Sequence, residues 1–416
     1  MKKILLLSGI TLFVFTSQLV SAKEEKCVTC HKKVTPGVVK DWKLSKHYLN
    51  GVSCSTCHGS AHTNASDADK AEIPTPDTCA QCHEEQVKQF KAGKHAKAWM
   101  VLKAMPTLNH QPPAMIEGQK GCGSCHSIGL KSKEEIKRLH KQGYKFGIAS
   151  CDACHTRHQF SVKEAKDPRA CQTCHMGFDH PQWEMYSTSK HGVRWQLQKD
   201  GVVSKNTPAP TCQSCHLPKG THNNRTAWGF LALRLPMPKD KQWAKDRATI
   251  LMALGVLDPN GKPTERLKAV KAADIVRLTQ KDWQHERNRM VKNCTQCHSK
   301  KFAEGELKKG DEMIKYADHI MAEAIRIVAG LYKDGIIKPA KDQKYAFPDI
   351  LRFHDVKNPI EQKLWTMFME YRMRTFQGTF HANPDYVTWY GWSEMVKTLN
   401  EIKGEAETLR RLHGKK

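Results

Sequence analysis

The pentapeptide Cys151-Asp-Ala-Cys-His155 places two cysteines three residues apart and a histidine directly after the second one. The same Cys-x-x-Cys-His arrangement occurs eight times in the 416-residue chain and uses all of its 16 cysteines. The cysteine pairs are Cys27/Cys30, Cys54/Cys57, Cys79/Cys82, Cys122/Cys125, Cys151/Cys154, Cys171/Cys174, Cys212/Cys215 and Cys294/Cys297. The histidines that complete the motifs are His31, His58, His83, His126, His155, His175, His216 and His298.

Two thiols at this spacing can form thioethers to the two vinyl groups of one haem, and the adjacent imidazole then reaches the iron. The sequence therefore predicts eight covalently bound c-type haems, with each motif histidine as an iron ligand. The alternative interpretations are a disulfide framework, a set of zinc sites and thioredoxin-like redox pairs. None of them explains a histidine after every second cysteine.

The first 22 residues have the pattern of a secretory signal peptide. Lys2 and Lys3 precede an apolar run over residues 4–20, and Ser21 and Ala22 are small residues suited to cleavage. An uncleaved membrane anchor is the alternative, although the run is short for a bilayer span. Because bacteria attach c-type haem outside the cytoplasm, the leader and the motifs together predict a periplasmic protein.

The chain is strongly basic, with a formal net charge of +25. Such a charge could indicate nucleic acid or an anionic membrane as a partner. Each haem carries two propionates, however, so we expect much of the Lys and Arg excess to balance the cofactors. We therefore predict no nucleic-acid partner, while the remaining charge could attract an anionic substrate or an acidic redox protein.

Composition divides the mature chain into two regions, both expected to be mainly α. Residues 23–228 carry seven motifs separated by short polar stretches, so haem faces must supply most of the buried apolar surface. Residues 229–416 carry the eighth motif and apolar residues at helical spacing. The pattern predicts helices over residues 265–292, 304–332, 361–376 and 392–412.

A low-spin electron-transfer haem commonly takes a second histidine on its far side. Fourteen histidines lie outside the motifs, and seven of them are predicted as distal ligands because of their position or their context. They are His47, His62, His95, His158, His191, His222 and His285. Each of them could instead be a surface histidine or one that binds a propionate.

Seven distal ligands leave one iron open to a small molecule. The dipeptide Asp179-His180 suits a distal pocket, because a carboxylate can tune an imidazole that relays protons. The alternative is that His180 is itself an axial ligand. If all eight irons were six-coordinate, the protein would be an electron conduit rather than an enzyme.

Three longer runs resemble the octahaem hydroxylamine oxidoreductase family over nearly the whole mature chain. They are Cys151-Asp-Ala-Cys-His-Thr-Arg-His158, the run from Cys171 to Gly192 that contains His-Met-Gly-Phe-Asp-His-Pro-Gln-Trp-Glu-Met-Tyr, and His381-Ala-Asn-Pro-Asp-Tyr-Val-Thr-Trp-Tyr-Gly391. The resemblance implies a mainly helical, homotrimeric protein with bis-histidine haems. It also implies that the fourth motif holds the catalytic haem, through Cys122, Cys125 and His126, with Asp179 and His180 as pocket residues.

In oxidative members of that family, a C-terminal tyrosine is cross-linked to the catalytic haem, and reductive members lack the link. Tyr371, Tyr386 and Tyr390 lie in the corresponding region, where they could equally be packing residues. The resemblance favours reduction of nitrite or hydroxylamine to ammonium, with a cytochrome or a quinol-linked donor as redox partner. Oxidation of hydroxylamine is the alternative. A lysine-ligated nitrite reductase is disfavoured, because the chain has no Cys-x-x-Cys-Lys motif.

Overall fold

A computed structural model describes residues 22–104, 111–112, 115, 121–143, 147–229, 231–276, 279–352 and 358–415. Within these ranges the backbone forms helices and no strand, apart from one isolated bridge between Leu257 and Pro263. The predicted mainly α fold is confirmed. Among the described helices, none combines the length and the apolar composition that a bilayer span requires. The predicted signal peptide lies, except for its last residue, outside the described ranges.

The chain divides into two compact units, and the first comprises Met1–Pro74 and His155–Ser161. Its helices are α1 (Ala22–Val34), α2 (Pro36–Lys43), α3 (Lys46–Leu49), α4 (Cys54–His58) and the 3-10 helix η1 (Ala65–Lys70). The first two motifs lie in α1 and α4. Val39 and Asp67 are among its few buried side chains, as expected where cofactors take the place of an aliphatic core.

The second unit comprises Thr75–Cys154 and Val162–Lys416. Its haem-motif part contains α5 (Pro76–Ala92), η2 (His95–Lys97), α6 (Ala98–Lys103), α8 (Cys122–His126), α9 (Lys133–Lys141), η4 (Cys151–Ala153), α10 (Val162–Ala165), α11 (Arg169–Gln172), α12 (Gln182–Ser187), α13 (Lys190–Lys199), α14 (Cys212–His216) and η5 (Pro218–Gly220). The C-terminal part contains α15 (Lys241–Ala253), α16 (Glu265–Ala272), α17 (Gln280–Cys294), α18 (Lys300–Lys333), α19 (Pro359–Thr366), η7 (Met367–Arg372), α20 (Met373–Phe380), α21 (Pro384–Val387), η8 (Thr388–Trp392) and α22 (Ser393–Leu412).

Several motifs are themselves single helical turns. Helices α4, α8 and α14 each begin at the first cysteine and end at the histidine. Side chains just before two of them accept a backbone N–H and cap the turn: Ser53 accepts from Thr56, and Thr211 accepts from Ser214. Residues three apart share one face of a helix, so both thiols of a motif point the same way.

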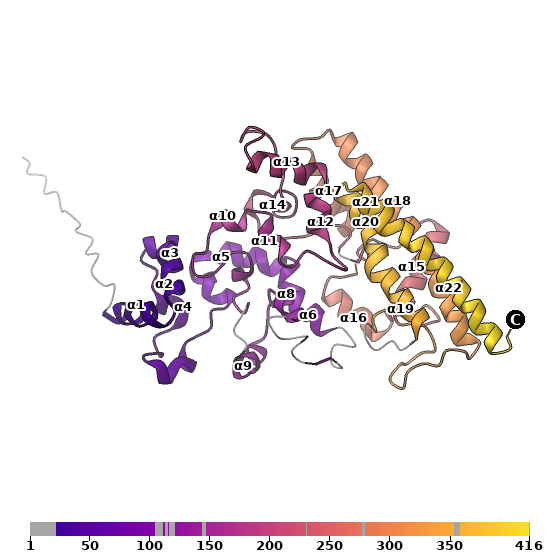
Figure 1. Cartoon of the computed structure of the whole chain (residues 1–416), viewed down its shortest axis with the longest axis horizontal. Helices are drawn as coiled ribbons and strands as arrows, with labels where there is room; N and C mark the ends of the chain where they lie inside the picture. Colours follow the sequence, from indigo (N-terminus) through magenta and orange to yellow (C-terminus); the bar gives the residue numbers. More distant parts are fainter. Residues whose placement is uncertain are drawn as a thin grey trace, which may run out of the picture. The chain divides into compact units, whose positions relative to one another are not determined.

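The C-terminal helices form a conventional apolar core around α18, which packs against α15, α20 and α22 (Figure 1). Ile250 of α15, Met321 and Ile325 of α18 and Ile402 of α22 have no exposed surface. Burying one such side chain stabilises a fold by roughly 1.5–3 kcal/mol. This part of the chain therefore has a core that does not depend on a cofactor.

The predicted helices are found with changed boundaries. The one over residues 304–332 is confirmed within α18. A single helix over residues 265–292 is wrong, because α16 ends at Ala272 and α17 begins at Gln280. Asp274 adopts a left-handed φ of 55° between them, which a continuing helix cannot contain.

The other two predicted helices are also extended or joined. The one over residues 361–376 begins earlier and continues through a π-helical turn, η7, into α20. The one over residues 392–412 is confirmed as α22 and follows a second π-helical turn, η8. Residue 228, where the composition changes, lies inside the second unit, so the division there stays a prediction about composition.

A buried ion cluster joins three of the C-terminal helices. Asp318 of α18 has no exposed surface and lies 2.7 Å from Arg247 and 2.8 Å from Arg372, measured between Oδ and Nη atoms. Trp243 donates from Nε1 to the same carboxylate over 2.8 Å. Burial by itself raises the pKa of Asp318, but the two guanidinium charges outweigh it and hold the pKa below its ordinary value.

We expect Asp318→Asn to destabilise the protein by about 3–5 kcal/mol, because it leaves two buried arginines without a counter-charge. Denaturant unfolding followed by circular dichroism measures the loss. Glu306→Gln is the matched control, since Glu306 lies on the same helix in an exposed pair with Lys309, and it should cost under about 1 kcal/mol. Equal unfolding midpoints for the two variants would contradict this account.

Candidate functional site: a chain of haem sites with one open position

Five motif histidines face a second histidine ring at nearly one spacing. The ring centroids are 6.2 Å apart for His31/His62, 6.1 Å for His58/His158, 6.1 Å for His175/His95, 6.5 Å for His216/His381 and 6.1 Å for His298/His191. An imidazole nitrogen lies about 2 Å from a metal it ligates, so two rings on opposite faces of one iron have centroids roughly 6 Å apart. The pairs therefore fit bis-histidine haems. His180 also lies 6.2 Å from His175, but both of its ring nitrogens bond oxygen atoms.

Hydrogen bonds at Nδ1 leave the other ring nitrogen available as a ligand. Nδ1 of His58 donates to the carbonyl of Glu72 over 3.0 Å, and Nδ1 of His381 donates to the carbonyl of Gln377 over 2.8 Å. A carbonyl only accepts, so Nδ1 carries the proton and Nε2 has the free lone pair. This is the tautomer that a haem iron requires.

Burial also keeps several of these imidazoles uncharged. It lowers the pKa of His95 to about 3, of His175 to about 4 and of His216 to about 4, and neighbouring histidines add to the effect. At neutral pH these rings are neutral, as metal ligands must be. All 16 cysteines lie in described residues and none forms a disulfide, so every motif retains both thiols for thioether bonds.

Some of the predicted haem-attachment cysteines are less buried than the expectation of a haem-packed interior suggests. Cys30, Cys82, Cys122 and Cys297 are exposed, and the other 12 cysteines are partly buried. A porphyrin edge rather than the polypeptide would cover such a sulfur. Thioether formation at all 16 cysteines stays a prediction. The ring pairs support it indirectly, because His31, His58 and His298 directly follow Cys30, Cys57 and Cys297.

Four other histidines are also predicted ligands. His222 lies near His83, whose charge lowers the pKa of His222 in addition to burial. The ring of His47 packs edge-on against Phe160, at 5.1 Å between centroids, and Phe160 also contacts His158. His47, His83, His155 and His222 stay predicted ligands.

His285 and His381 differ from what the sequence suggested. His285 is exposed on α17, whereas His381 faces the motif histidine His216. Sequence reasoning missed His381 because no motif lies near it and its partner is far along the chain. The favourable position of His285, shortly before the eighth motif, is a local signal that the fold does not use, since His191 faces His298 there.

The fourth motif is different. Nδ1 of His126, at the end of α8, donates to the carbonyl of Ala98 over 3.0 Å. Among the described residues no second histidine ring faces His126 at the bis-histidine spacing. Burial lowers the pKa of His126, and the nearest titratable side chains that affect it are His180 and Asp179. His110 and His354 lie outside the described residues.

Asp179 and His180 form the contact that the sequence suggested. Nδ1 of His180 donates to the carboxylate of Asp179, and Nε2 lies 2.6 Å from the carbonyl of Cys174. Both ring nitrogens thus face oxygen acceptors, which favours the doubly protonated ring. Burial lowers the pKa of His180, but the hydrogen bond and the charge of Asp179 outweigh it and raise the pKa above its ordinary value.

The C-terminal helices hold the segment that carries this pair. Phe178 stacks on Trp365 of α19 with the ring centroids 5.3 Å apart. Gln182 donates from Nε2 to Oε1 of Gln377 over 3.0 Å. Arg374 donates from Nη2 to the carbonyl of Phe178 over 3.4 Å. Residues almost 200 positions downstream therefore position Asp179 and His180.

Motifs of the second unit lie next to one another in an order that the sequence does not give. Three pairs of thiols lie within hydrogen-bonding range of each other: Cys79/Cys151, Cys125/Cys174 and Cys171/Cys212. Charge interactions also join Cys154 to Cys171 and Cys215 to Cys294. The motifs therefore follow the order third, fifth, sixth, seventh and eighth, and the fourth branches from the sixth.

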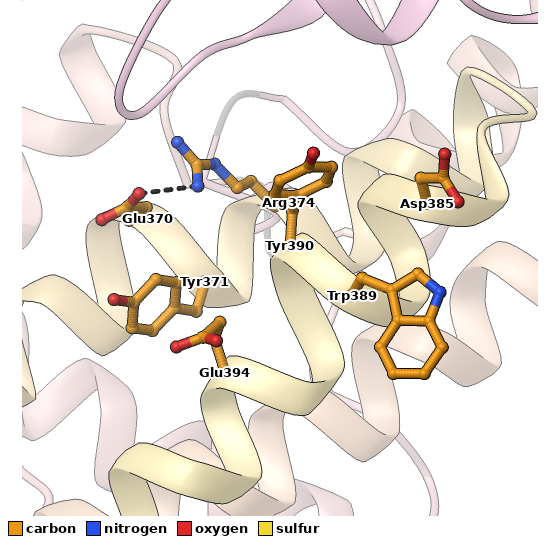
Figure 2. Close-up of a pocket in the computed structure, with 7 residues that line it drawn as sticks. All are labelled: Glu370, Tyr371, Arg374, Asp385, Trp389, Tyr390 and Glu394. Atoms are coloured by element: carbon orange, nitrogen blue, oxygen red, sulfur yellow. Dashed lines mark ion pairs between the residues drawn. The ribbon is translucent and has the colours of Figure 1, made fainter.

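A cavity of about 510 Å³ lies among η7, α20, α21, η8 and α22 and was not predicted from the sequence. Figure 2 shows Glu370 paired with Arg374 on one side and Trp389 beside Asp385 on the other. Its other lining residues are Tyr371, Tyr390 and Glu394. Trp389 is 66 % exposed, an unusual position for a tryptophan. Arg374 links this cavity to Phe178, next to Asp179.

Comparison with known proteins supports a multihaem cytochrome. Residues 50–250 and 265–345 match the family described as seven times multi-haem cytochrome CxxCH, and residues 14–59 match cytochrome c554 and c-prime. A probable nitrite reductase-hydroxylamine oxidoreductase fusion protein of Kuenenia stuttgartiensis is 28 % identical over 496 residues, which cover 96 % of this chain and 53 % of the relative. The chain thus spans about half the length of that relative.

Two solved structures share the fold. A reducing HAO-like protein complex of Kuenenia stuttgartiensis superposes with a TM-score of 0.71 at 24 % identity, over 94 % of this chain and 86 % of that chain. A hypothetical multiheme protein superposes with a TM-score of 0.67 at 20 % identity, over 95 % and 97 %. At this identity the likeness establishes the architecture alone.

The ring geometry predicts different outcomes for two histidine variants. His381→Ala should convert one low-spin haem to a high-spin form, because its iron loses the ligand opposite His216. His285→Ala should leave the spectrum unchanged, since His191 rather than His285 faces the histidine of the eighth motif. Electron paramagnetic resonance of the oxidised holoprotein measures both. An additional high-spin signal in the His285 variant, together with no additional signal in the His381 variant, would restore the sequence-based assignment.

Proposed function

The chain belongs to the seven times multi-haem cytochrome CxxCH family, and we propose that it is a periplasmic octahaem oxidoreductase that reduces nitrite or hydroxylamine to ammonium. The observation that carries the proposal is the contrast between His126 and the five motif histidines that face a second ring. An iron with an empty sixth position can bind a small nitrogen compound, whereas a bis-histidine iron transfers electrons only.

The proposed ligand set follows from the ring pairs. We assign His62, His158, His222, His47, His95, His381 and His191 as distal ligands of the first, second, third, fifth, sixth, seventh and eighth haems. His285, a candidate from the sequence, is left out because His191 faces the eighth motif histidine, His298, and no described motif histidine faces His285. The cysteines and motif histidines keep their predicted roles. Under this assignment seven haems form an electron path and the fourth is the reaction centre.

The haem held by Cys122, Cys125 and His126 would supply an iron that binds the substrate nitrogen and passes electrons to it. Cleavage of an N–O bond with loss of water needs protons in step with those electrons. The doubly protonated ring of His180 directs one N–H to the carboxylate of Asp179 and the other to the carbonyl of Cys174. Its raised pKa keeps that proton available near neutral pH. His180 is thus the proposed proton donor, and Asp179 orients it.

The direction of the reaction is supported by the names of two similar proteins. The curated relative is called a nitrite reductase-hydroxylamine oxidoreductase fusion protein, and the solved complex is called reducing. Electrons would come from a redox cytochrome or a quinol-linked donor. We also propose a homotrimer in which the exposed Tyr390 and the half-buried Tyr371 face a neighbouring subunit without a cross-link to its haem. The alternatives are hydroxylamine oxidation and electron transfer without a substrate.

Purified holoprotein given a reduced dye and nitrite or hydroxylamine should form ammonium. Its intact mass should equal the processed chain plus eight haems, with no mass change from a tyrosine link. Added cyanide should shift the spectrum of one high-spin haem. Rapid hydroxylamine oxidation without ammonium formation would overturn the reductive direction. An unchanged spectrum with every added ligand would identify an electron conduit.

Asp179→Asn should lower the rate of ammonium formation by about 10²-fold or more, as expected when a general acid loses its orientation. The rate of the unmodified enzyme should fall as the pH rises through the raised pKa of His180. Without the Asp179 carboxylate that pKa falls, so the decline should begin at lower pH. His319→Gln is the control. His319 also bonds a carboxylate, that of Asp246, over 2.9 Å, but it lies on α18, away from the segment that carries Asp179 and His180. A matching loss in both variants would remove His180 from the mechanism.

A further inference from the structure

The first haem site has two histidines with chemically different partners. His31 and His62 face each other at 6.2 Å between ring centroids. Nδ1 of His31 lies 2.7 Å from the hydroxyl oxygen of Thr35, whereas Nδ1 of His62 donates to Oδ1 of Asp67 over 2.9 Å. One proposed axial ligand therefore bonds a neutral group and the other bonds a carboxylate.

Asp67 is held in place by a built turn rather than by chance contact. The backbone N–H groups of Thr63 and Asn64 both donate to Oδ1 over 2.9 Å, and the Thr63 hydroxyl donates to Oδ2 over 2.8 Å. Asn64 also donates from Nδ2 to Oδ2 over 3.2 Å. Asp67 is only 8 % exposed. The bonds between Asn64 and Asp67 are the capping box at the start of η1, and they fix the carboxylate where Nδ1 of His62 reaches it.

The other paired histidines with a described Nδ1 bond have neutral acceptors. His58 donates to the carbonyl of Glu72, and His381 donates to the carbonyl of Gln377. A carboxylate draws the Nδ1 proton more strongly than a carbonyl does, which makes Nε2 a stronger electron donor to a bound metal. Stronger donation stabilises ferric over ferrous iron and lowers the reduction potential of a haem.

We propose that Asp67 is a positioning residue that lowers the reduction potential of the haem bound by His31 and His62. The effect is on a one-electron reduction: an iron held by His31 and His62 would take up an electron less readily than one with a neutral acceptor at Nδ1. A haem bound here would therefore pass an electron on to haems of higher potential. This suits a site where a low-potential donor delivers electrons. The inference rests on the proposed ligation of the first haem by His62.

Asp67→Asn tests the proposal with little change in shape. The amide oxygen can still accept from His62 Nδ1 and from the backbone N–H groups of Thr63 and Asn64, which donate to Oδ1. The variant removes the charge together with the acceptor at Oδ2, which the side chains of Thr63 and Asn64 use. In a potentiometric titration of the holoprotein, one haem should become easier to reduce by about tenfold in its reduction equilibrium, or about 59 mV for one electron. Asp67→Glu should recover part of the original potential.

Two controls separate hydrogen bonding from general effects. Asp69→Asn removes the same charge from the exposed side of η1, two residues away. Thr63→Val removes a hydroxyl that bonds Asp67 but keeps the carboxylate. Neither should shift a potential as far as Asp67→Asn does. An equal shift in Asp69→Asn would mean a long-range charge effect, and an equal shift in Thr63→Val would mean loosening of the turn; either result overturns the proposal, as does no shift in Asp67→Asn.

His62→Ala distinguishes failure of this inference from failure of the proposed ligand set. If His62 is the distal ligand, the variant gains one high-spin haem in the electron paramagnetic resonance spectrum. If His62→Ala gives that signal but Asp67→Asn leaves the reduction potential unshifted, Asp67 has no such role, while His62 remains the distal ligand. Absence of the signal would remove the ligation of the first haem, while ammonium formation tests the reaction independently of both.

Discussion

The spacing between two imidazole rings is the constraint on which the rest of this structure depends. Rings 6.1–6.5 Å apart at their centroids leave room for one metal ion between them and for little else. Holding two rings there requires the chain to return to the same place from different directions. His158 meets His58 and His381 meets His216, and in each pair a motif histidine on a short turn is one of the two partners.

That constraint explains why the two parts of the chain are built differently. The helices of the motif regions are short, and many are single turns that orient thiols and an imidazole. Such turns bury little apolar surface, and an isolated helix of this length is unstable in water. The C-terminal helices, by contrast, bury continuous apolar faces and the Asp318 cluster. Trp365, Arg374 and Gln377 then extend that stability to the segment holding Asp179 and His180.

Differences between the haem sites arise in the contacts around the histidines rather than in the motifs. The pentapeptides at Cys27 and Cys122 have the same form. At the first site, however, Nδ1 of His31 lies near a hydroxyl and Nδ1 of His62 bonds a carboxylate. At the fourth site, Nδ1 of His126 bonds a backbone carbonyl. These acceptors tune the donor strength of a ligand without changing the ligand itself. The same Cys-x-x-Cys-His motif can therefore serve both the electron-transfer sites and the open site.

The sequence by itself determined the haem-attachment motifs, the mainly α class and the pairing of Asp179 with His180, because each depends on residues close together in the chain. It also predicted six proposed distal histidines, several of which lie within a few residues of a motif. His381 could be found only from the tertiary structure, since it meets His216 through the packing of α20 against distant helices. The break between α16 and α17, the branching order of the motifs and the cavity near Trp389 have the same origin. Covalent chemistry is encoded locally, whereas ligand geometry depends on where long-range packing brings the chain together.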